Sequence, residues 1–331
     1  MINVGKLSYT FVLLTPDKKQ YDITGMVQDG GWEEGKGELA THINGTMGNG
    51  KYKGKRVSSI IKNGCLVRIL VSTGGKKKEV ARGTVVDWEV SRNHTKNNFE
   101  FGAYDNLYFF QESQDNYYFS KGTSTKTALM KIFNDWKIPV SKYEGPNIEH
   151  AKMAYRNQTL SNIVLEILDE ASTKSKNKYL IRSEKGKVQV LQRGTNKDVY
   201  HFAALNTEMV SYKQSISGMV TRVKVIGQED DDGKSSTEAI VDGDTKYGIR
   251  QKIYVKPKDD SVADAKKEAE KILDEDGKPS RTITLESPDV PFIKKGDKIH
   301  VNTEFIKGYF YVVSIRHYCD DATMTMEIEH V

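Results

Sequence analysis

The feature that most constrains the fold of this chain is a short pattern that occurs twice. Residues 61–69 and 293–301 both read Ile-Lys-x-Gly and then continue as an alternating apolar run typical of a β-strand. Each segment later reaches a second glycine, which opens another strand. The turn glycines are Gly64 and Gly83 in the first segment and Gly296 and Gly308 in the second. A true repeat predicts two related β-domains in one chain, whereas the alternative is that Ile-Lys-x-Gly is a common way to begin a turn.

The first third of the chain is rich in strand signals. Runs with β-branched and aromatic residues lie at 8–14, 65–72, 84–90 and 99–110, separated by turn clusters of Gly, Pro, Asp and Ser. Short strands between glycine-rich turns favour a barrel or a sandwich. We therefore expect an N-terminal β-barrel domain over residues 1–118.

A helical period then replaces the strand pattern. Apolar residues recur at helical spacing over 125–136 and 159–171, each after a Ser or Thr that can cap the helix. The second helix is too short to be stable alone, so its apolar face should pack on the strand pair predicted over 178–192. Residues 119–205 are accordingly predicted to form a small α/β domain.

Strand patterns return in residues 206–331, together with two further elements. The stretch 229–244 holds seven acidic side chains and one lysine, and we expect it to be an exposed hairpin tip. A helix is predicted over 261–275, because Gly277 and Pro279 follow its apolar stripe. The predicted fold class is mainly β with an α/β insertion. Two related β-barrel domains flank the small α/β domain, and residues 206–331 form the second of them.

Charge, hydropathy and cysteine content exclude several classes of protein. Among 331 residues, 50 are Lys or Arg and 45 are Asp or Glu, and nucleic-acid binders usually concentrate positive charge more than this. No apolar run approaches the roughly 20 residues of a membrane span, and the first residues lack the layout of a signal peptide. Cys65 and Cys319 form no CxxC motif, which excludes a disulfide scaffold and a cysteine-based zinc site. We expect a protein made in a reducing cytoplasm.

Two glycine-rich segments resemble nucleotide-binding motifs but lack essential parts of them. Residues 45–52 fit a P-loop until Tyr52, which stands where a Ser or Thr must bind Mg²⁺. Residues 35–40 carry the glycines of a dinucleotide fingerprint but do not follow a predicted strand. We interpret the first segment as a flexible loop and the second as a turn, and we expect no cofactor.

Ionisable residues offer no recognisable catalytic or metal-binding set. The sequence around Asp230 and Asp232 resembles a calcium loop but lacks its final bidentate carboxylate. Glu33 and Glu34 are neighbours, but they lie in a polar stretch, whereas glycoside hydrolysis needs one acid in an apolar pocket with a raised pKa. We therefore expect no catalytic residue, no cofactor-binding residue and no metal ligand.

Two stretches carry a family resemblance. The first runs over residues 124–193 and contains Trp-Lys-Ile-Pro at 136–139 and Asn-Gln-Thr-Leu-Ser-Asn-Ile at 157–163. The second begins with Gly-Asp-Lys-Ile-His-Val at 296–301 and closes on Met-Thr-Met-Glu-Ile at 324–328. Together they resemble the XkdQ/YqbQ family of tail proteins from PBSX-like prophages, Gram-positive contractile-tailed phages and related R-type bacteriocins.

The resemblance implies the structural hub of a contractile-tail baseplate. Such hubs are similar in architecture to the T-even phage hub and to the hub portion of VgrG and late-control-D proteins. They are homotrimers in which two related barrels per subunit form a pseudo-sixfold ring. The ring joins the tail tube to the central spike and encloses a channel. Expected partners are the tail tube, spike, tape-measure and other baseplate proteins, with DNA only as passing cargo and no membrane binding. The resemblance favours the repeat over a chance turn motif.

The resemblance also implies a place in the virion or tail particle, assembled in the bacterial cytoplasm. A channel that passes DNA should avoid a strongly basic wall, because phosphate attraction would hold the cargo. We therefore expect Lys76, Lys77 and Lys78, at a predicted hairpin tip, to lie outside the channel. Two other functions stay open: a tail-tip peptidoglycan hydrolase and, given the 17 tyrosines, a cell-wall-binding module.

Overall fold

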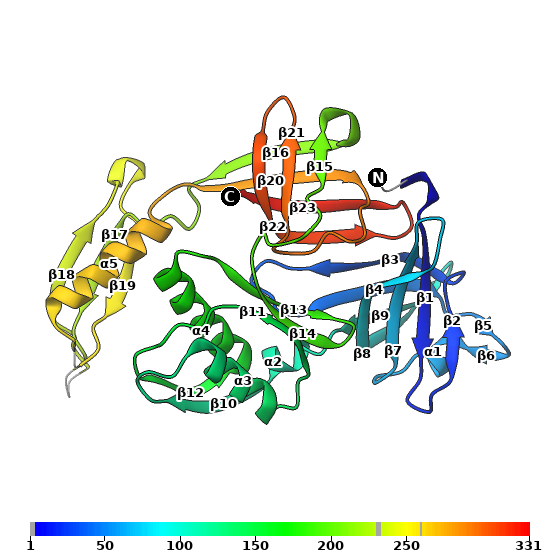
Figure 1. The fold of residues 1–331 in the computed structure, drawn as a ribbon, viewed down its shortest axis with the longest axis horizontal. Helices are drawn as coiled ribbons and strands as arrows, with labels where there is room; N and C mark the ends of the chain where they lie inside the picture. The colour runs from blue at the N-terminus through cyan, green and yellow to red at the C-terminus, as the bar shows by residue number, and fades with distance from the viewer. Residues whose placement is uncertain (1–3, 230–232, 259) are drawn as a thin grey trace. The chain divides into compact units, whose positions relative to one another are not determined.

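A computed structural model describes residues 4–229, 233–258 and 260–331 (Figure 1). The described chain is mainly β, with helices concentrated in two places. It divides into two compact units, Met1–Val210 with Thr284–Val331, and Ser211–Ile283. The predicted mainly β class with an α/β insertion agrees with this element content. Asp230 and Asp232, from the segment that resembles a calcium loop, lie outside the described residues.

The N-terminal part of the first unit holds six strands that we call the first strand set. Their order in the sheet is β3-β4-β9-β8-β7-β1. The strands are β1 (Ser8–Leu14), β3 (Val27–Glu34), β4 (Thr41–Gly48), β7 (Leu66–Ser72), β8 (Lys78–Arg92) and β9 (Asn97–Tyr104). Smaller elements beside them are η1 (Val4–Lys6), β2 (Gln20–Asp22), β5 (Lys51–Tyr52), β6 (Lys55–Arg56) and α1 (Val57–Ile60). Their shared core includes Trp32, Met47, Ile69 and Phe99.

The four strands predicted for this part are confirmed with one correction, whereas β3 and β4 lie where the sequence indicated glycine-rich turns. The predicted strand over 99–110 ends at Tyr104, and its last third belongs to the helix α2 (Tyr108–Glu112). The cause lies in Asp105, whose carboxylate accepts a hydrogen bond from the Leu107 backbone amide at 2.9 Å. Such a local turn competes with strand continuation and allows the chain to turn into the helix.

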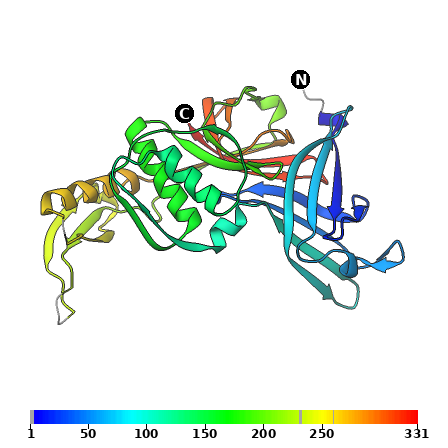
Figure 2. The same cartoon turned by 60° about the horizontal axis from the view of Figure 1, so that its bottom comes forward.

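The α/β part follows, and both of its predicted long helices are confirmed. Its elements are α3 (Thr125–Asp135), α4 (Leu160–Ser175), β10 (Gln114–Phe119), β11 (Val140–Glu144), β12 (Met153–Thr159), β13 (Tyr179–Glu184) and β14 (Lys187–Gln192). Ser124 and Thr159 cap the two helices, which lie side by side in both views (Figures 1 and 2). As expected, α4 shares its core with the β13–β14 hairpin, through Ile181 and Val190.

The C-terminal part contributes a second strand set of six strands, in the sheet order β16-β20-β23-β22-β21-β15. The strands are β15 (His201–Ala203), β16 (Met209–Ser215), β20 (Ser280–Pro288), β21 (Lys298–Asn302), β22 (Lys307–Tyr318) and β23 (Thr323–His330). A short helix, η2 (Ala204–Asn206), lies between β15 and β16. The boundary between the two compact units falls inside β16 and β20.

The two strand sets have the same order along the chain and the same order in the sheet. Strands β1, β3, β4, β7, β8 and β9 correspond in turn to β15, β16, β20, β21, β22 and β23. One difference is that β1 pairs antiparallel with β7, whereas β15 pairs parallel with β21. Among the described strands, no pairing closes either set on itself, so the barrel form of each set stays a prediction.

The correspondence extends to single hydrogen bonds. Gly64 N donates to Val85 O at 2.9 Å, and Val85 N donates to Cys65 O at 2.8 Å. In the second set, Gly296 N donates to Val312 O at 2.8 Å, and Val312 N donates to Asp297 O at 2.9 Å. In both sets, the ladder to the next strand then shifts register directly after this valine. A β-bulge at the same place in both sets is a shared structural feature that a common turn motif would not produce.

The second unit has its own small core. Its elements are β17 (Arg222–Ile226), β18 (Thr237–Asp242), η3 (Thr245–Tyr247), β19 (Gln251–Val255) and α5 (Val262–Asp276). The helix confirms the prediction over 261–275 and packs its Ala265 and Ala269 on Val223 and Val225. These small and β-branched side chains let the helix approach the sheet closely.

The acidic stretch 229–244 is not a single hairpin tip. Glu238 and Asp242 lie within β18, and Asp244 accepts a hydrogen bond from the Lys246 amide at the start of η3. Asp242 also pairs with Arg222 across the β17–β18 ladder, with Nε to Oδ1 at 2.5 Å. The acidic run therefore serves several local roles.

Candidate functional site: the junction between the two strand sets

The two strand sets meet where β3 pairs antiparallel with the C-terminal half of β22. The register places Glu34 opposite Ile315 and Gly31 opposite Tyr318. One bond beyond this ladder, Cys319 N donates to Gly30 O at 2.9 Å. We call this pairing the junction. It makes the two sets one continuous sheet, so it decides how one set is attached to the other.

A buried aromatic pair lies at the centre of the junction. The Trp32 and His317 rings stack with centroids 4.1 Å apart and planes 14° apart. His317 is fully buried, and its Nδ1 lies 2.6 Å from Oδ1 of the equally buried Asp289. The other oxygen of Asp289 accepts a hydrogen bond from the Tyr9 hydroxyl. Burial and the adjacent carboxylate raise the pKa of Tyr9, so this hydroxyl keeps its proton and remains a donor.

Gly31 allows the junction to form at all. A Cβ atom at this position would lie 2.1 Å from the His317 carbonyl oxygen, which is backbone and cannot be displaced without shifting β22. Glycine is therefore required by the close approach of the two strands.

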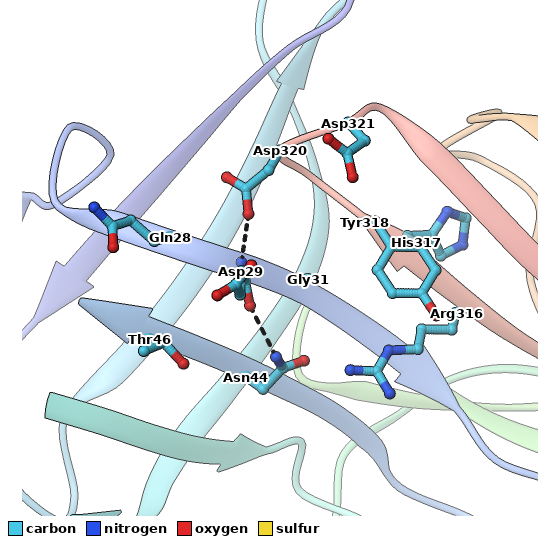
Figure 3. Close-up of a pocket in the computed structure, with 11 residues that line it drawn as sticks. Gln28, Asp29, Gly31, Asn44, Thr46, Arg316, His317, Tyr318, Asp320 and Asp321 are labelled. Atoms are coloured by element: carbon cyan, nitrogen blue, oxygen red, sulfur yellow. Dashed lines mark hydrogen bonds between the residues drawn. The ribbon is translucent and has the colours of Figure 1, made fainter. Parts of the chain in front are cut away.

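A polar pocket of about 360 Å³ opens beside the junction (Figure 3). Its walls come from β3, β4, the last residues of β22 and the turn that follows β22. The Asp320 carboxylate accepts a hydrogen bond from the Gly30 amide at 2.9 Å, and Asn44 donates to the Asp29 carbonyl at 3.1 Å. Both side chains therefore hold the backbone of β3 in place. Across the described residues, no group of three acidic, His or Cys side chains is arranged to hold a metal ion.

A buried charge cluster lies near the other end of β3. The Glu34 carboxylate accepts a hydrogen bond from the Lys295 amide at 3.0 Å, and Lys295 Nζ donates to the Gly35 carbonyl at 2.9 Å. Arg182, from β13, pairs with Asp297 at 2.9 Å. Burial lowers the pKa of Lys295 and raises that of Asp297, and the Arg182 charge opposes the second shift. The cluster thus connects both strand sets to the α/β part.

The predicted turn glycines are only partly brought into correspondence. Gly64 and Gly296 occupy the same place, with φ of 83° and 84°. Gly83 pairs with Val67, and the corresponding pair in the second set is Phe310 with Ile299. Gly83 therefore corresponds to Phe310 and not to Gly308, which lies two residues earlier in its strand. The separation along the chain from Gly64 to Gly83 is longer than that from Gly296 to Gly308, in part because the hairpin between β21 and β22 is shorter than the hairpin between β7 and β8.

Other segments singled out in the sequence have ordinary structural places. Gly45 and Gly48 lie inside β4, which corrects the flexible loop expected for 45–52. Gly45 fits there because a Cβ would lie 2.7 Å from the Phe101 ring. Residues 35–40 form the predicted turn between β3 and β4. No helix in the described ranges is long and apolar enough to cross a membrane.

The remaining charged candidates lie in two places. Glu33 is engaged by His42, with Oε1 and Nδ1 3.0 Å apart, which lowers the Glu33 pKa, and Glu34 belongs to the buried charge cluster. Lys76 and Lys77 lie at the tip between β7 and β8, and Lys78 begins β8.

The residues that build the junction were not identified from the sequence. Tyr9, Trp32, Asp289 and His317 share no motif and are far apart along the chain. The repeat was the one sequence signal related to these residues, because two copies of a domain in one chain imply a contact between the copies.

Three comparisons with known proteins agree with this architecture. Phage-like element PBSX protein XkdQ of Bacillus subtilis (strain 168) is 24% identical over 261 residues, which cover 77% of this chain and 79% of that protein. Two crystal structures share the fold. A 43 kDa tail protein of prophage MuSo2 from Shewanella oneidensis has a TM-score of 0.67 at 14% identity, over 97% of this chain and 98% of that one. The tail protein from Neisseria meningitidis MC58 has a TM-score of 0.65 at 15% identity, over 97% and 96%.

The family comparison covers most of the sequence. The profile of the family described as YQBQ-like matches residues 38–330, which include the whole of the α/β part and the second strand set. This match confirms the resemblance found in the sequence. The chain belongs to the YQBQ-like family.

Proposed function

We propose that the chain is the structural baseplate hub of a contractile phage-like tail. Three copies form a ring with pseudo-sixfold symmetry that joins the tail tube to the central spike and encloses a channel. The observation that carries the proposal is the correspondence of the two strand sets in chain order, sheet order and bulge position. Three chains with two similar sets present six similar surfaces, which suit a sixfold tube on one side and a threefold spike on the other.

The fold and the family support a tail or baseplate role. Solved structures with the same fold are described as tail proteins, and the relative from Bacillus subtilis is described as a protein of a phage-like element. In this proposal each strand set is one barrel of the ring. Residues 1–118 supply the first barrel, and residues 206–331 supply the second together with β15, which comes from the end of the predicted α/β segment 119–205. The partners are the tube, spike, tape-measure and other baseplate proteins, and DNA is only passing cargo.

Light scattering tests the assembly. The purified chain, alone or with its tube and spike proteins, should have the mass of three copies, and electron microscopy of the ring should show six similar densities around a channel. Lys76, Lys77 and Lys78 should lie away from the channel wall. A chain that stays monomeric beside both partners would contradict the proposal.

The proposed role is not catalytic. Zymography with peptidoglycan and a pull-down with cell walls test the hydrolase and wall-binding alternatives directly. We expect neither lysis nor retention. Clear lysis by the purified chain would replace the hub with a tail-tip hydrolase.

A further inference from the structure

One strand edge of the first set has no partner within the described residues. Beyond its bulge, β8 continues over residues 88–92 and pairs there only with β9. Asn93 N donates to Lys96 O, which fixes the alternation of the ladder. The amides of Glu89 and Ser91 therefore point to β9, and those of Trp88, Val90 and Arg92 point the other way. Among the described residues, these outward groups form a strand edge without a neighbouring strand, and at its start Asn63 and Lys62 contact the Trp88 side chain.

The corresponding edge of the second set is covered. Because Val85 corresponds to Val312, Trp88 corresponds to Ile315 and Val90 to His317. Ile315 and His317 are 2% and 0% exposed, since β3 pairs with this half of β22. Val90 is 41% exposed. The first set thus presents, uncovered, the surface that the second set buries at the junction.

The strand that would cover this edge is also present in the chain. β3 covers β22, and the strand that corresponds to β3 is β16. β16 ends the sheet order and pairs only with β20 among the described strands. It carries exposed apolar side chains, Met209 and Tyr212. One chain therefore holds both halves of a second junction, an open β8 edge and an open β16, and the described part of the chain pairs neither of them with a further strand.

We infer that β16 of one copy pairs antiparallel with residues 88–92 of β8 in the next copy, so that the β3–β22 junction is reproduced between chains. This inference rests on the proposed ring and identifies its subunit interface. The occupant is a second copy of this chain, because the covering strand already seen inside the chain has its counterpart in β16. Each copy pairs its β16 with one neighbour and its residues 88–92 with the other neighbour. Such a head-to-tail contact can close into a ring.

Exposed strand edges with apolar side chains are also physically suited to pairing. Unpaired backbone groups along a strand are a template for another strand, and proteins that must stay monomeric usually block them with proline, charge or a covering loop. Residues 88–92 contain no proline. Val90, at the centre of the segment between the charged Glu89 and Arg92, is apolar and exposed.

Proline substitution at Val90 tests the inference. The Val90 amide points away from β9, so Val90→Pro removes a donor only from the open edge and leaves the β8–β9 ladder intact. The matched control is Gln20→Pro in β2. The bond from Ile23 N to Phe11 O implies that the Gln20 amide also points away from its neighbouring strand, and β2 ends the sheet on the opposite side. Light scattering of the full chain is measured for all three proteins.

The expected result is a trimer for the wild type and for Gln20→Pro, and a folded monomer for Val90→Pro. Circular dichroism identifies a variant that fails to fold. If Val90→Pro unfolds, hydrogen exchange on the wild type decides instead. The hydrogen-exchange rates of the Trp88 and Arg92 amides should be at least about tenfold lower at concentrations where the trimer forms than after dilution to monomer.

The outcomes separate this inference from the proposed function. A Val90→Pro chain that remains trimeric, or edge amides that exchange equally fast in trimer and monomer, would reject this interface and keep the ring. A wild-type chain that is monomeric at every concentration, also beside its tube and spike proteins, would reject both. Protection of residues 88–92 only after addition of the tube protein would assign the edge to that partner and reject pairing between copies.

Discussion

At the scale of single residues, the junction depends on the absence of one side chain. Gly31 lies in the ladder between β3 and β22, and a Cβ there would meet the His317 carbonyl at 2.1 Å. Gly31→Ala should therefore lower the free energy of unfolding by about 3 kcal/mol, because backbone must move to make room. Urea denaturation followed by tryptophan fluorescence measures this, since Trp32 lies in the junction.

Gly25 offers a matched control for this substitution. It lies in the turn between β2 and β3, and a Cβ there would have no atom within 4 Å. Gly25→Ala should change the free energy of unfolding by about 0.5 kcal/mol or less. Equal effects of the two substitutions would show that the close approach at Gly31 is not what limits stability.

A buried carboxyl group should make stability depend on pH. Asp105 accepts hydrogen bonds from the amides of Thr41 and Leu107, and burial raises its pKa to about 6, above the ordinary 3.8. Between these two values the folded chain holds a proton that the unfolded chain has lost. The free energy of unfolding from this group therefore falls as the pH rises from about 4 to about 6. The full loss is about 3 kcal/mol at most.

Asp105→Asn isolates this contribution. The amide does not titrate and cannot accept both backbone hydrogen bonds, so the variant is less stable throughout. The stability difference between wild type and variant should be largest near pH 4 and should shrink towards pH 7. Urea titrations across this range measure it, and parallel pH profiles would assign the dependence to other groups.

At the scale of elements, the sequence predicted best what depends on local pattern. The helices α3 and α4 were found from the spacing of apolar residues and from their caps, Ser124 and Thr159. Helix α5 was found from its apolar stripe and from the Gly277 and Pro279 that follow it. The hairpin between β13 and β14 was found from its turn, where Lys185 and Gly186 both have positive φ. These signals lie within a few residues and do not depend on the rest of the fold.

Predictions that required long-range pairing were less accurate. The repeat was recognised, but Gly83 was aligned with Gly308, because only the strand register shows that Phe310 takes its place. β16 and β20 were not recognised as counterparts of β3 and β4, since residues 216–279 separate them. Trp32 and His317 became a pair only when two distant strands met.

The two corresponding turn glycines allow an internal comparison. At Gly64, with φ of 83°, a Cβ would lie 3.9 Å from Pro16, so Gly64→Ala should cost about 1 kcal/mol of backbone strain. At Gly296, with φ of 84°, a Cβ would lie 1.9 Å from Leu180 Cδ2, so Gly296→Ala should cost about 2 kcal/mol. Denaturation midpoints measure both.

A double-mutant cycle identifies the source of the difference. If Leu180 causes the additional cost, Gly296→Ala should be less destabilising in a Leu180→Ala background, with a coupling of about 1 kcal/mol. Additive effects would place the strain in the backbone alone and would contradict the role given to Leu180.

At the scale of the whole molecule, the second unit is inserted into the second strand set. It occupies the place that the short turn over 35–40 has between β3 and β4. Ser280 Oγ donates to the Ser215 carbonyl at 3.1 Å, so the two ends of the insertion are adjacent. Replacing residues 216–279 with a short glycine–serine turn should therefore leave the first unit folded, with its thermal midpoint unchanged within a few degrees.

The α/β part provides the contrasting deletion. Its core includes Leu39 and Leu107, which belong to loops of the first strand set. Removing residues 119–200 would expose both side chains and should lower the thermal midpoint strongly or prevent folding. Calorimetry measures the thermal midpoints of both deletion variants. If both deletions left the thermal midpoint unchanged, the packing assigned to these leucines would be contradicted.

The duplicated strand sets also have a consequence for the order of assembly. In the proposed ring, six strand sets are connected by six contacts between neighbouring sets. Half of these contacts are β3–β22 junctions within one chain, which form as the chain folds and do not depend on its concentration. Only the other half, the contacts between neighbouring chains, require encounters between molecules. Ring formation should then respond to dilution as a reaction of three bodies and not of six. A chain that carries two strand sets consequently completes its ring at a lower concentration than separate subunits with one set each, when the contacts between sets have the same strength.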